Sequence, residues 1–293
     1  MKAFASFHPV VLLAYFIAVL SVAMFADHPV LLGEALVAGI CFNAMIAKKG
    51  TLLSDLGFYF FLFLVIVITN PLFSHNGATP LFFLNGNAVT LEALLSGLSI
   101  AVLLVGVLFW FKCYSHVMTS DKFFYLFGKP IPRLSLILSM VLRFVPLFKI
   151  QMKRVRNAQK TLGMYSSDRY TDKIRASMGV FSVMITWALE NAVETGDSMK
   201  ARGYGLKGKS HYSLFRFTRQ DGILLAGIGI LLGVLLAVLA SGRLAFSFYP
   251  RVQSMQFGLM PGIAFASFGI LVFLPFIIEI KERIKWNYFV SKI

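Results

Sequence analysis

One arginine lies between two small residues at the end of a polar stretch, Glu190–Gly205 (ENAVETGDSMKARGYG). Arg202 follows Ala201 and precedes Gly203. A guanidinium group offers five N–H donors in a planar fork, which suits the carboxylates or main-chain carbonyls of a binding partner. The small neighbours would let the walls of a groove close around that fork. The predicted chemistry is recognition of a partner protein, and a solvated helix end is the alternative.

The residues before Arg202 predict a helix over about 172–201 with two distinct edges. Small residues at steps of four, four and three let another helix approach closely: they are Ala188, Ala192, Gly196 and Met199. An acidic edge has the same spacing: Glu190, Glu194 and Asp197. Lys200 and Arg202 close the helix at the end where cations suit the helix dipole.

A second helix with a similar end is predicted upstream, over about 132–163. Its first part, Leu134–Val145, is almost entirely apolar, and Pro146 is expected to kink it. A basic stripe at helical spacing follows: Lys149, Lys153, Arg156 and Lys160. Leu162 precedes Gly163, a natural helix stop. Both helices therefore end in a basic tip followed by glycine, which fits the helix-in-groove mode of binding.

Signatures of enzymes are missing from the chain. There is no Gly-rich phosphate loop with Gly-Lys-Ser/Thr, no HExxH and no GxSxG. Clustered carboxylates within an apolar segment are also absent. The chain is therefore expected neither to hydrolyse ATP by itself nor to act as an enzyme, and Cys41 and Cys113 are interpreted as inert apolar side chains.

The composition predicts an all-α integral membrane protein. Of the 293 residues 58% are hydrophobic and only 14% are charged, with a mean hydropathy of +0.76. A spanning helix needs roughly 20 predominantly apolar residues. Six such segments are predicted, at about 9–26, 29–47, 52–70, 91–112, 222–241 and 261–280. Two long cytoplasmic helices are predicted in an insertion between the fourth and fifth spans.

The distribution of charge supports a membrane topology rather than binding to nucleic acid. The net charge is +15, and 19 of the 28 Lys and Arg lie between Lys112 and Arg219. Basic residues beside spans mark the cytoplasmic side. The opposite side then carries only Arg243 and Arg251, and both termini are cytoplasmic. Three parts are predicted: a bundle over 1–112, a cytoplasmic region over 113–220 and a terminal pair of spans over 221–293.

Two features stay open at this point. Glu34 lies early in the second span, where an acid is a functional candidate, but the positive end of the helix dipole also accounts for it. The uncharged segment Asn70–Thr90 contains two prolines and an Asn85-Gly86 turn signal. It fits either a non-helical hairpin dipping toward the membrane or a plain external loop.

Several segments resemble the transmembrane T component of energy-coupling factor (ECF) transporters, and together they cover most of the chain. They are FHPVVLLAYFIAVLSVAMFADHP, NPLFSHNGATPLF, SDKFFYLFGKPIPRLSLILSMVLRFVPL, AQKTLG and MKARGYG. The resemblance implies a scaffold in the plasma membrane of a prokaryote. The scaffold joins two ABC-type ATPases to a small membrane protein, the S component, which binds a vitamin or a metal ion. ATP and Mg²⁺ are then expected on the ATPases, and no cofactor on this chain.

The resemblance also implies which residues dock on the ATPases. Each of the family's two coupling helices ends in an Ala-Arg-Gly-like motif. Ala201, Arg202 and Gly203 match the second motif in full. The first motif is matched by Ala158, Gln159, Lys160 and Gly163. Leu162 stands where the family has arginine, so either Lys160 replaces it in part or one ATPase accepts an apolar side chain.

Other classes of membrane protein remain alternatives. A self-contained channel or secondary transporter should carry more buried ionisable groups than Glu34, and a lipid-modifying enzyme needs clustered His, Asp or Glu. A conventional ABC permease also docks on ATPases, but through one short coupling loop rather than two separate helix tips.

Overall fold

The computed structural model describes residues 3–46, 49–74, 76–84, 87–128, 132–163, 169–206, 215–254 and 258–291. The chain divides into two compact units. The first, here called the bundle, combines 1–123 with 215–293, and the second, here called the arm, comprises 124–214. The segments 1–112 and 221–293, which the sequence suggested as separate parts, pack together in the bundle.

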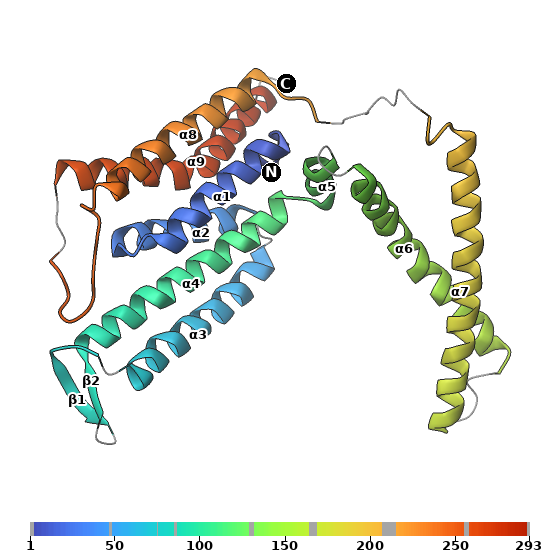
Figure 1. The fold of residues 1–293 in the computed structure, drawn as a ribbon, viewed down its shortest axis with the longest axis horizontal. Coiled ribbons are helices and arrows are strands. Elements are labelled where there is room, and N and C mark those ends of the chain that lie inside the picture. The colour runs from blue at the N-terminus through green and yellow to red at the C-terminus, as the bar shows by residue number, and fades with distance from the viewer. Residues whose placement is uncertain are drawn as a thin grey trace. The chain divides into compact units, whose positions relative to one another are not determined.

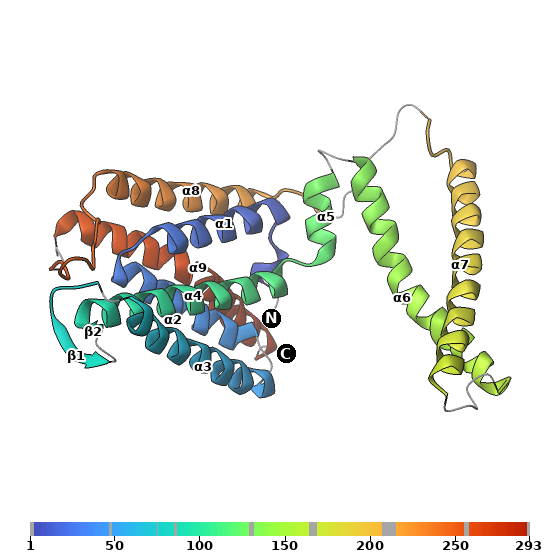
Figure 2. The ribbon, with the colours of Figure 1, turned by 60° about the horizontal axis from the view of Figure 1, so that its bottom comes forward.

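The described part of the bundle is built from helices that lie side by side (Figures 1 and 2). They are α1 (Pro9–Phe25), α2 (Pro29–Ile46), α3 (Lys49–Phe73), α4 (Leu91–Val117), α8 (Arg219–Ala240) and α9 (Leu259–Val290). Helix α4 packs against α2 and α3, while α9 packs against α8 and α2. Over most of their length their sequences are apolar on all sides, which is typical of helices buried in protein or lipid. The predicted all-α integral membrane class is confirmed.

The same tripeptide, His-Pro-Val, begins both α1 and α2. The Nδ1 atoms of His8 and His28 accept hydrogen bonds from the N–H groups of Val10 and Val30, each at 3.3 Å. Proline suits the first helical position because its missing N–H would have no partner there. These two histidines therefore cap helices.

An aromatic cluster fills the centre of the bundle. Trp110 of α4 is fully buried, and its ring lies 6.1 Å from that of Tyr15 and 6.2 Å from that of Phe16. Its Nε1–H donates to the carbonyl of Ala35 at 2.9 Å, which joins α4 to α2. Gly39, one turn further along α2, leaves room for the indole: a Cβ there would lie 3.2 Å from Nε1.

In the described residues, six helices are long and apolar enough to cross a membrane, but they differ from the predicted six in one member. Helix α1 has only 17 residues, about 25 Å, because Ala26 is extended and the next helix begins at Pro29. Helix α7 (Tyr170–Ala201) is instead long and apolar enough to cross a membrane, although it carries an acidic edge and is the least apolar of the six. The predicted span over 9–26 is therefore shorter than expected.

The segment between α3 and α4 contains a two-stranded antiparallel hairpin, β1 (Pro80–Leu84) and β2 (Asn87–Thr90). Asn85 and Gly86, the predicted turn, lie outside the described residues. Glu92 is buried at the start of α4 and accepts hydrogen bonds from the N–H and hydroxyl of Thr79, at 3.3 and 2.8 Å. The hairpin thus replaces a plain loop, and a buried carboxylate ties it to the bundle.

A five-residue segment, Phe4–His8, is bound at the opposite end of the bundle by three buried charged side chains, and we call it the N-terminal anchor. Glu279 of α9 accepts a hydrogen bond from the N–H of Phe4 at 3.2 Å. Asp221 of α8 accepts one from the N–H of His8 at 2.8 Å. Lys122 donates to the carbonyl of Ala5 and, at 2.9 Å, to that of Val117, the last residue of α4.

Two glycines of α2 provide a matched test of the core. Gly39→Leu should lower the unfolding free energy by about 1–3 kcal/mol, because the added side chain overlaps Trp110 and Phe109. Gly33→Leu is the control, since a Cβ there meets nothing within 4 Å. Thermal unfolding of the two purified variants in detergent measures the difference. Equal melting temperatures would contradict the described packing of α2 on α4.

Candidate functional site

The arm contains the two long helices that carry the candidate docking residues. Helix α5 (Ser120–Gly128) leads out of the bundle, and α6 (Pro132–Thr161) and α7 follow. The two helices predicted at about 132–163 and 172–201 are confirmed, and α6 continues through Pro146 as one element. The helices of the arm are drawn in green and yellow in Figure 1.

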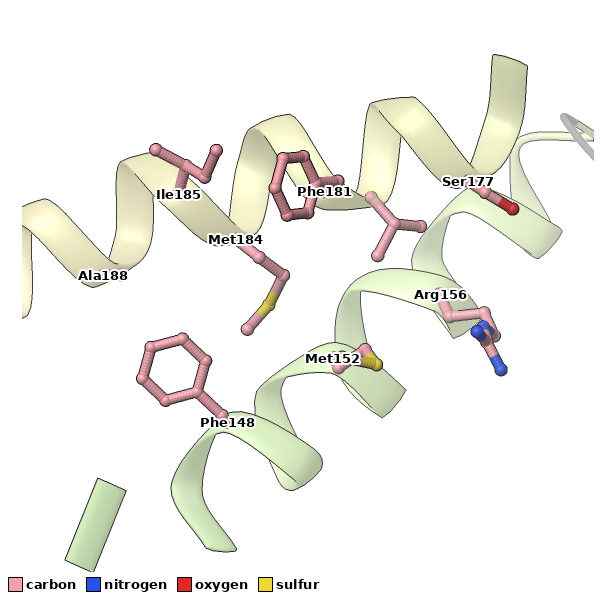
Figure 3. Close-up of a pocket in the computed structure, with 9 residues that line it drawn as sticks. Phe148, Met152, Arg156, Ser177, Phe181, Met184, Ile185 and Ala188 are labelled. Atoms are coloured by element: carbon pink, nitrogen blue, oxygen red, sulfur yellow. The ribbon is translucent and has the colours of Figure 1, made fainter. Parts of the chain in front are cut away.

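Helices α6 and α7 cross through a small apolar contact. The rings of Phe148 and Trp187 lie 5.2 Å apart, edge to face. On α7 the residues buried at this crossing are Ala176, Val180 and Met184, spaced four apart. A cavity of about 290 Å³ opens beside the crossing, and Figure 3 shows Phe148 and Met184 extending into it from the two helices. Its other walls are mainly aliphatic, aromatic and thioether side chains.

The row of small residues predicted for helix contact is mostly uncovered in the described arm. Ala188 borders the cavity, but Ala192 is exposed, and a Cβ on Gly196 would meet nothing within 4 Å. Beyond Ala188, the helix that this row is predicted to admit is therefore not α6. The physical reason is that α6 crosses α7 nearer its start, where Ala176 and Gly179 admit it.

Arg202 occupies the last position of α7 before a left-handed glycine. Gly203 has φ +78°. Its N–H donates to the carbonyl of Lys200 at 2.9 Å, and the N–H of Tyr204 donates to that of Met199 at 3.0 Å. These two bonds define a Schellman motif, with Gly203 as the left-handed residue. Arg202 is exposed and makes no ion pair with any described residue.

Leu162 occupies the equivalent position at the end of α6. Gly163 has φ +76°, and its N–H donates to the carbonyl of Lys160 at 3.1 Å, as that of Gly203 does to Lys200. Leu162 is 77% exposed, which is unusual for a leucine in contact with water alone. The backbone therefore presents Leu162 and Arg202 in the same way, and only the chemistry of the side chain differs.

The remaining residues predicted at the first tip separate into exposed and buried ones. Ala158 and Lys160 are exposed, as is Ala201 at the second tip. Gln159 is instead buried against α7. With its amide oriented to suit its neighbours, its nitrogen donates to the carbonyl of Ala176 at 3.1 Å and its oxygen accepts from the N–H of Val180 at 3.2 Å. Gln159 thus joins the two helices and is not part of the exposed tip.

The bundle holds charged residues that sequence patterns did not indicate as a group. Asp55 of α3 and Lys112 of α4 form an ion pair. Glu34, partly buried on α2, has a buried Oε2 that accepts no hydrogen bond from the described residues, and Gly269 of α9 lies beside it. The sequence does contain a pattern that indicates Asp221: Thr218 and Asp221 have the spacing of a helix capping box, and they form one. No local pattern pointed to Lys122 or Glu279.

Taken together, the fold and the tips define a multi-pass membrane protein with a two-helix arm that ends in two exposed caps. The family model described as cobalt transport protein (CbiQ) matches residues 5–212, more than half of the chain. The chain belongs to this family.

Curated relatives point the same way. The chain is 32% identical over 108 residues to the energy-coupling factor transporter transmembrane protein EcfT of Listeria innocua, covering 36% of this chain and 41% of that protein. It is 26% identical over 191 residues to the EcfT of Staphylococcus aureus, covering 61% of this chain and 71% of that one. The chain spans about two fifths of the length of the L. innocua relative. These findings confirm the resemblance drawn from the sequence motifs.

The left-handed glycine gives a testable expectation for the second tip. Gly203→Ala should destabilise the cap by about 1–2 kcal/mol, because a Cβ is strained at positive φ. Amide hydrogen exchange in a peptide covering 199–204 should then become about tenfold faster. Gly196→Ala is the control, since Gly196 is helical and its Cβ position is open. Unchanged exchange in Gly203→Ala would contradict the described cap.

Proposed function

We propose that this chain is the T component of an ECF-type importer, a scaffold that connects two cytoplasmic ABC-type ATPases to a membrane S component. The observation that carries the proposal is the pair of equivalent helix ends. Each presents one exposed side chain, Leu162 or Arg202, immediately before a left-handed glycine. A cap of this kind stops the helix abruptly, so the side chain and the last turn can enter a groove together. Membership in the CbiQ family supports the same function.

The arm suits the transmission of movement between its tips. Helix α7 has 32 residues and is therefore about 48 Å long. The crossing lies in the first half of α7, so Arg202 is separated from it by about four turns of helix. Packed helices move as rigid bodies by hinge or shear. We infer that closure of two ATPases around ATP and Mg²⁺ would displace the tips and tilt the arm, without any cofactor on this chain.

The apolar surface of the arm is the proposed binding surface for the S component. Met152 and Met184 line the cavity at the crossing, and thioether side chains repack easily around different partners. Exposed apolar residues continue from it along α7: Met178, Phe181, Leu189 and Val193. The uncovered small residues Ala192 and Gly196 would let a partner helix approach this face closely. The substrate, a vitamin or a metal ion, would be bound by the S component.

The proposed orientation follows from the distribution of charge. Basic residues concentrate in the arm and its neighbourhood, so we place the arm and both termini in the cytoplasm of a prokaryotic cell. Helix α7 then lies outside the lipid despite its apolar stretch, because its acidic edge and the exposed Arg202 favour water and protein partners. Helix α1 crosses with one face buried in the bundle and with the N-terminal anchor extending its length.

Affinity purification from native membranes tests the proposal as a whole. The tagged chain should bring down two ATPase polypeptides and at least one small membrane protein, identified by mass spectrometry. A self-contained transporter would be recovered alone and would still move substrate in liposomes. Recovery alone, with transport intact, would overturn the assignment.

The second tip can be tested with one charge reversal. Arg202→Glu should reduce co-purification of one ATPase at least about tenfold, because a charged hydrogen bond is lost and a like charge faces the partner's acceptors. Arg175→Glu on the same helix is the control, since Arg175 is also exposed but lies far from the tip. Equal loss in both variants would point to a general effect of charge and against docking by Arg202.

The first tip calls for a different substitution. Leu162→Asp should weaken binding of the other ATPase, because an apolar contact worth about 1.5–3 kcal/mol is replaced by a carboxylate that must be desolvated. Leu162→Met should retain binding, because it keeps the volume and apolar character. Pull-down with each ATPase separately resolves which tip serves which subunit. Full binding by Leu162→Asp would show that this tip is no anchor.

A further inference from the structure

Both crossings of the chain between the bundle and the arm lie next to residues that hold the N-terminal anchor. The chain leaves the bundle after Phe123, and Lys122 directly precedes that boundary. The chain returns at Phe215, and Asp221 follows in the first turn of α8. Lys122 and Asp221 belong to strongly separated parts of the sequence, yet they bind the same five residues, Phe4–His8.

Where the chain returns to the bundle, both carboxylate oxygens of Asp221 accept hydrogen bonds. The carboxylate of Asp221 accepts from the N–H of His8 at 2.8 Å through Oδ1. Through Oδ2 it accepts from the N–H and the hydroxyl of Thr218, at 2.8 and 2.6 Å. The ring of Phe217 also lies 5.3 Å from that of His8, edge to face. The first residues after the arm are therefore fixed against the anchor through both polar and aromatic contacts.

Where the chain leaves the bundle, the buried amine of Lys122 on α5 binds the N-terminal anchor. Lys122 is 8% exposed and donates to two carbonyls, Ala5 in the anchor and Val117 at the end of α4. Burial lowers the pKa of this amine, whereas the two carbonyl acceptors favour its protonated form. Because a buried lysine is costly, an apolar side chain would fill the same space at less cost if packing were its only role.

We propose that the N-terminal anchor is the fixed point of the arm, and that Lys122 and Asp221 are positioning residues that couple ATP hydrolysis to transport. A lever transmits motion to the bundle only when its points of attachment do not give way. With both attachments hydrogen-bonded to one segment, a tilt of the arm would reach the bundle as force on α1, α4, α8 and α9. Glu279 completes the fixed point by holding the N–H of Phe4 from α9.

This inference rests on the proposed function, and the test separates the two. Lys122→Met and Asp221→Asn are compared with wild type as complete complexes in liposomes, with ATP inside the compartment that faces the arm. Uptake of radioactive Co²⁺ or of a tritiated vitamin, whichever the wild-type complex accumulates, is divided by the ATP hydrolysed in the same sample. The ATPases should still co-purify and hydrolyse ATP, while uptake per ATP falls about tenfold in each variant.

Two control variants distinguish coupling from stability. Glu92→Gln alters an equally buried carboxylate of the same bundle that also accepts a backbone N–H, but at the end away from both crossings. It should lower the melting temperature and leave uptake per ATP unchanged. Lys122→Arg keeps a cationic donor and should recover part of the coupling lost in Lys122→Met.

The opposite outcomes are equally distinct. Loss of folded complex with an unchanged ratio of uptake to hydrolysis would show that the anchor only stabilises the bundle, and would overturn the inference. A fall in the ratio of the same size in Glu92→Gln would overturn it as well. Absence of ATPases from the wild-type complex would instead refute the proposed function itself.

Discussion

The bundle depends on pairing backbone groups at the end where α1 and α8 begin and α4 ends. A buried N–H or carbonyl without a partner is costly. Three charged side chains from separate elements meet this need at Phe4, Ala5 and His8. Their burial is tolerated because each charge is itself hydrogen-bonded. The same interactions tie the chain's start to both boundaries of the arm.

At the other end of the bundle, buried polar side chains also bind backbone groups, here those next to the hairpin. Glu92 holds Thr79, and Thr90 caps α4 while its hydroxyl donates to the carbonyl of Asn76 at 2.7 Å. Tyr249, from the connection between α8 and α9, reaches Ser96 at 2.8 Å between their hydroxyl oxygens. The ends of the hairpin are therefore fixed by polar contacts to the start of α4, which suits a segment without helical backbone pairing near a membrane.

The arm, unlike the bundle, buries few of its side chains. It has a small crossing, an open cavity and long rows of exposed apolar residues, which together mark a part of low intrinsic stability. Exposed apolar faces of this extent indicate surfaces that partners cover. The two caps differ in chemistry, leucine against arginine, although each places that side chain directly before a left-handed glycine whose N–H bonds to the carbonyl three residues earlier. A scaffold that binds two unequal subunits would be built in this way, since each cap can then select its own groove.

The sequence alone determined the membrane class, the long helices of the arm and the glycines that end them, because apolar runs and helix caps are local properties. It also indicated Leu162 as the departure from the first tip motif. Tertiary structure alone decided that Gln159 faces α7, that the row beyond Ala188 is uncovered, and that Lys122, Asp221 and Glu279 share one segment. Those outcomes depend on where helices cross and on contacts between residues more than one hundred positions apart, and no local pattern of spacing or charge records them.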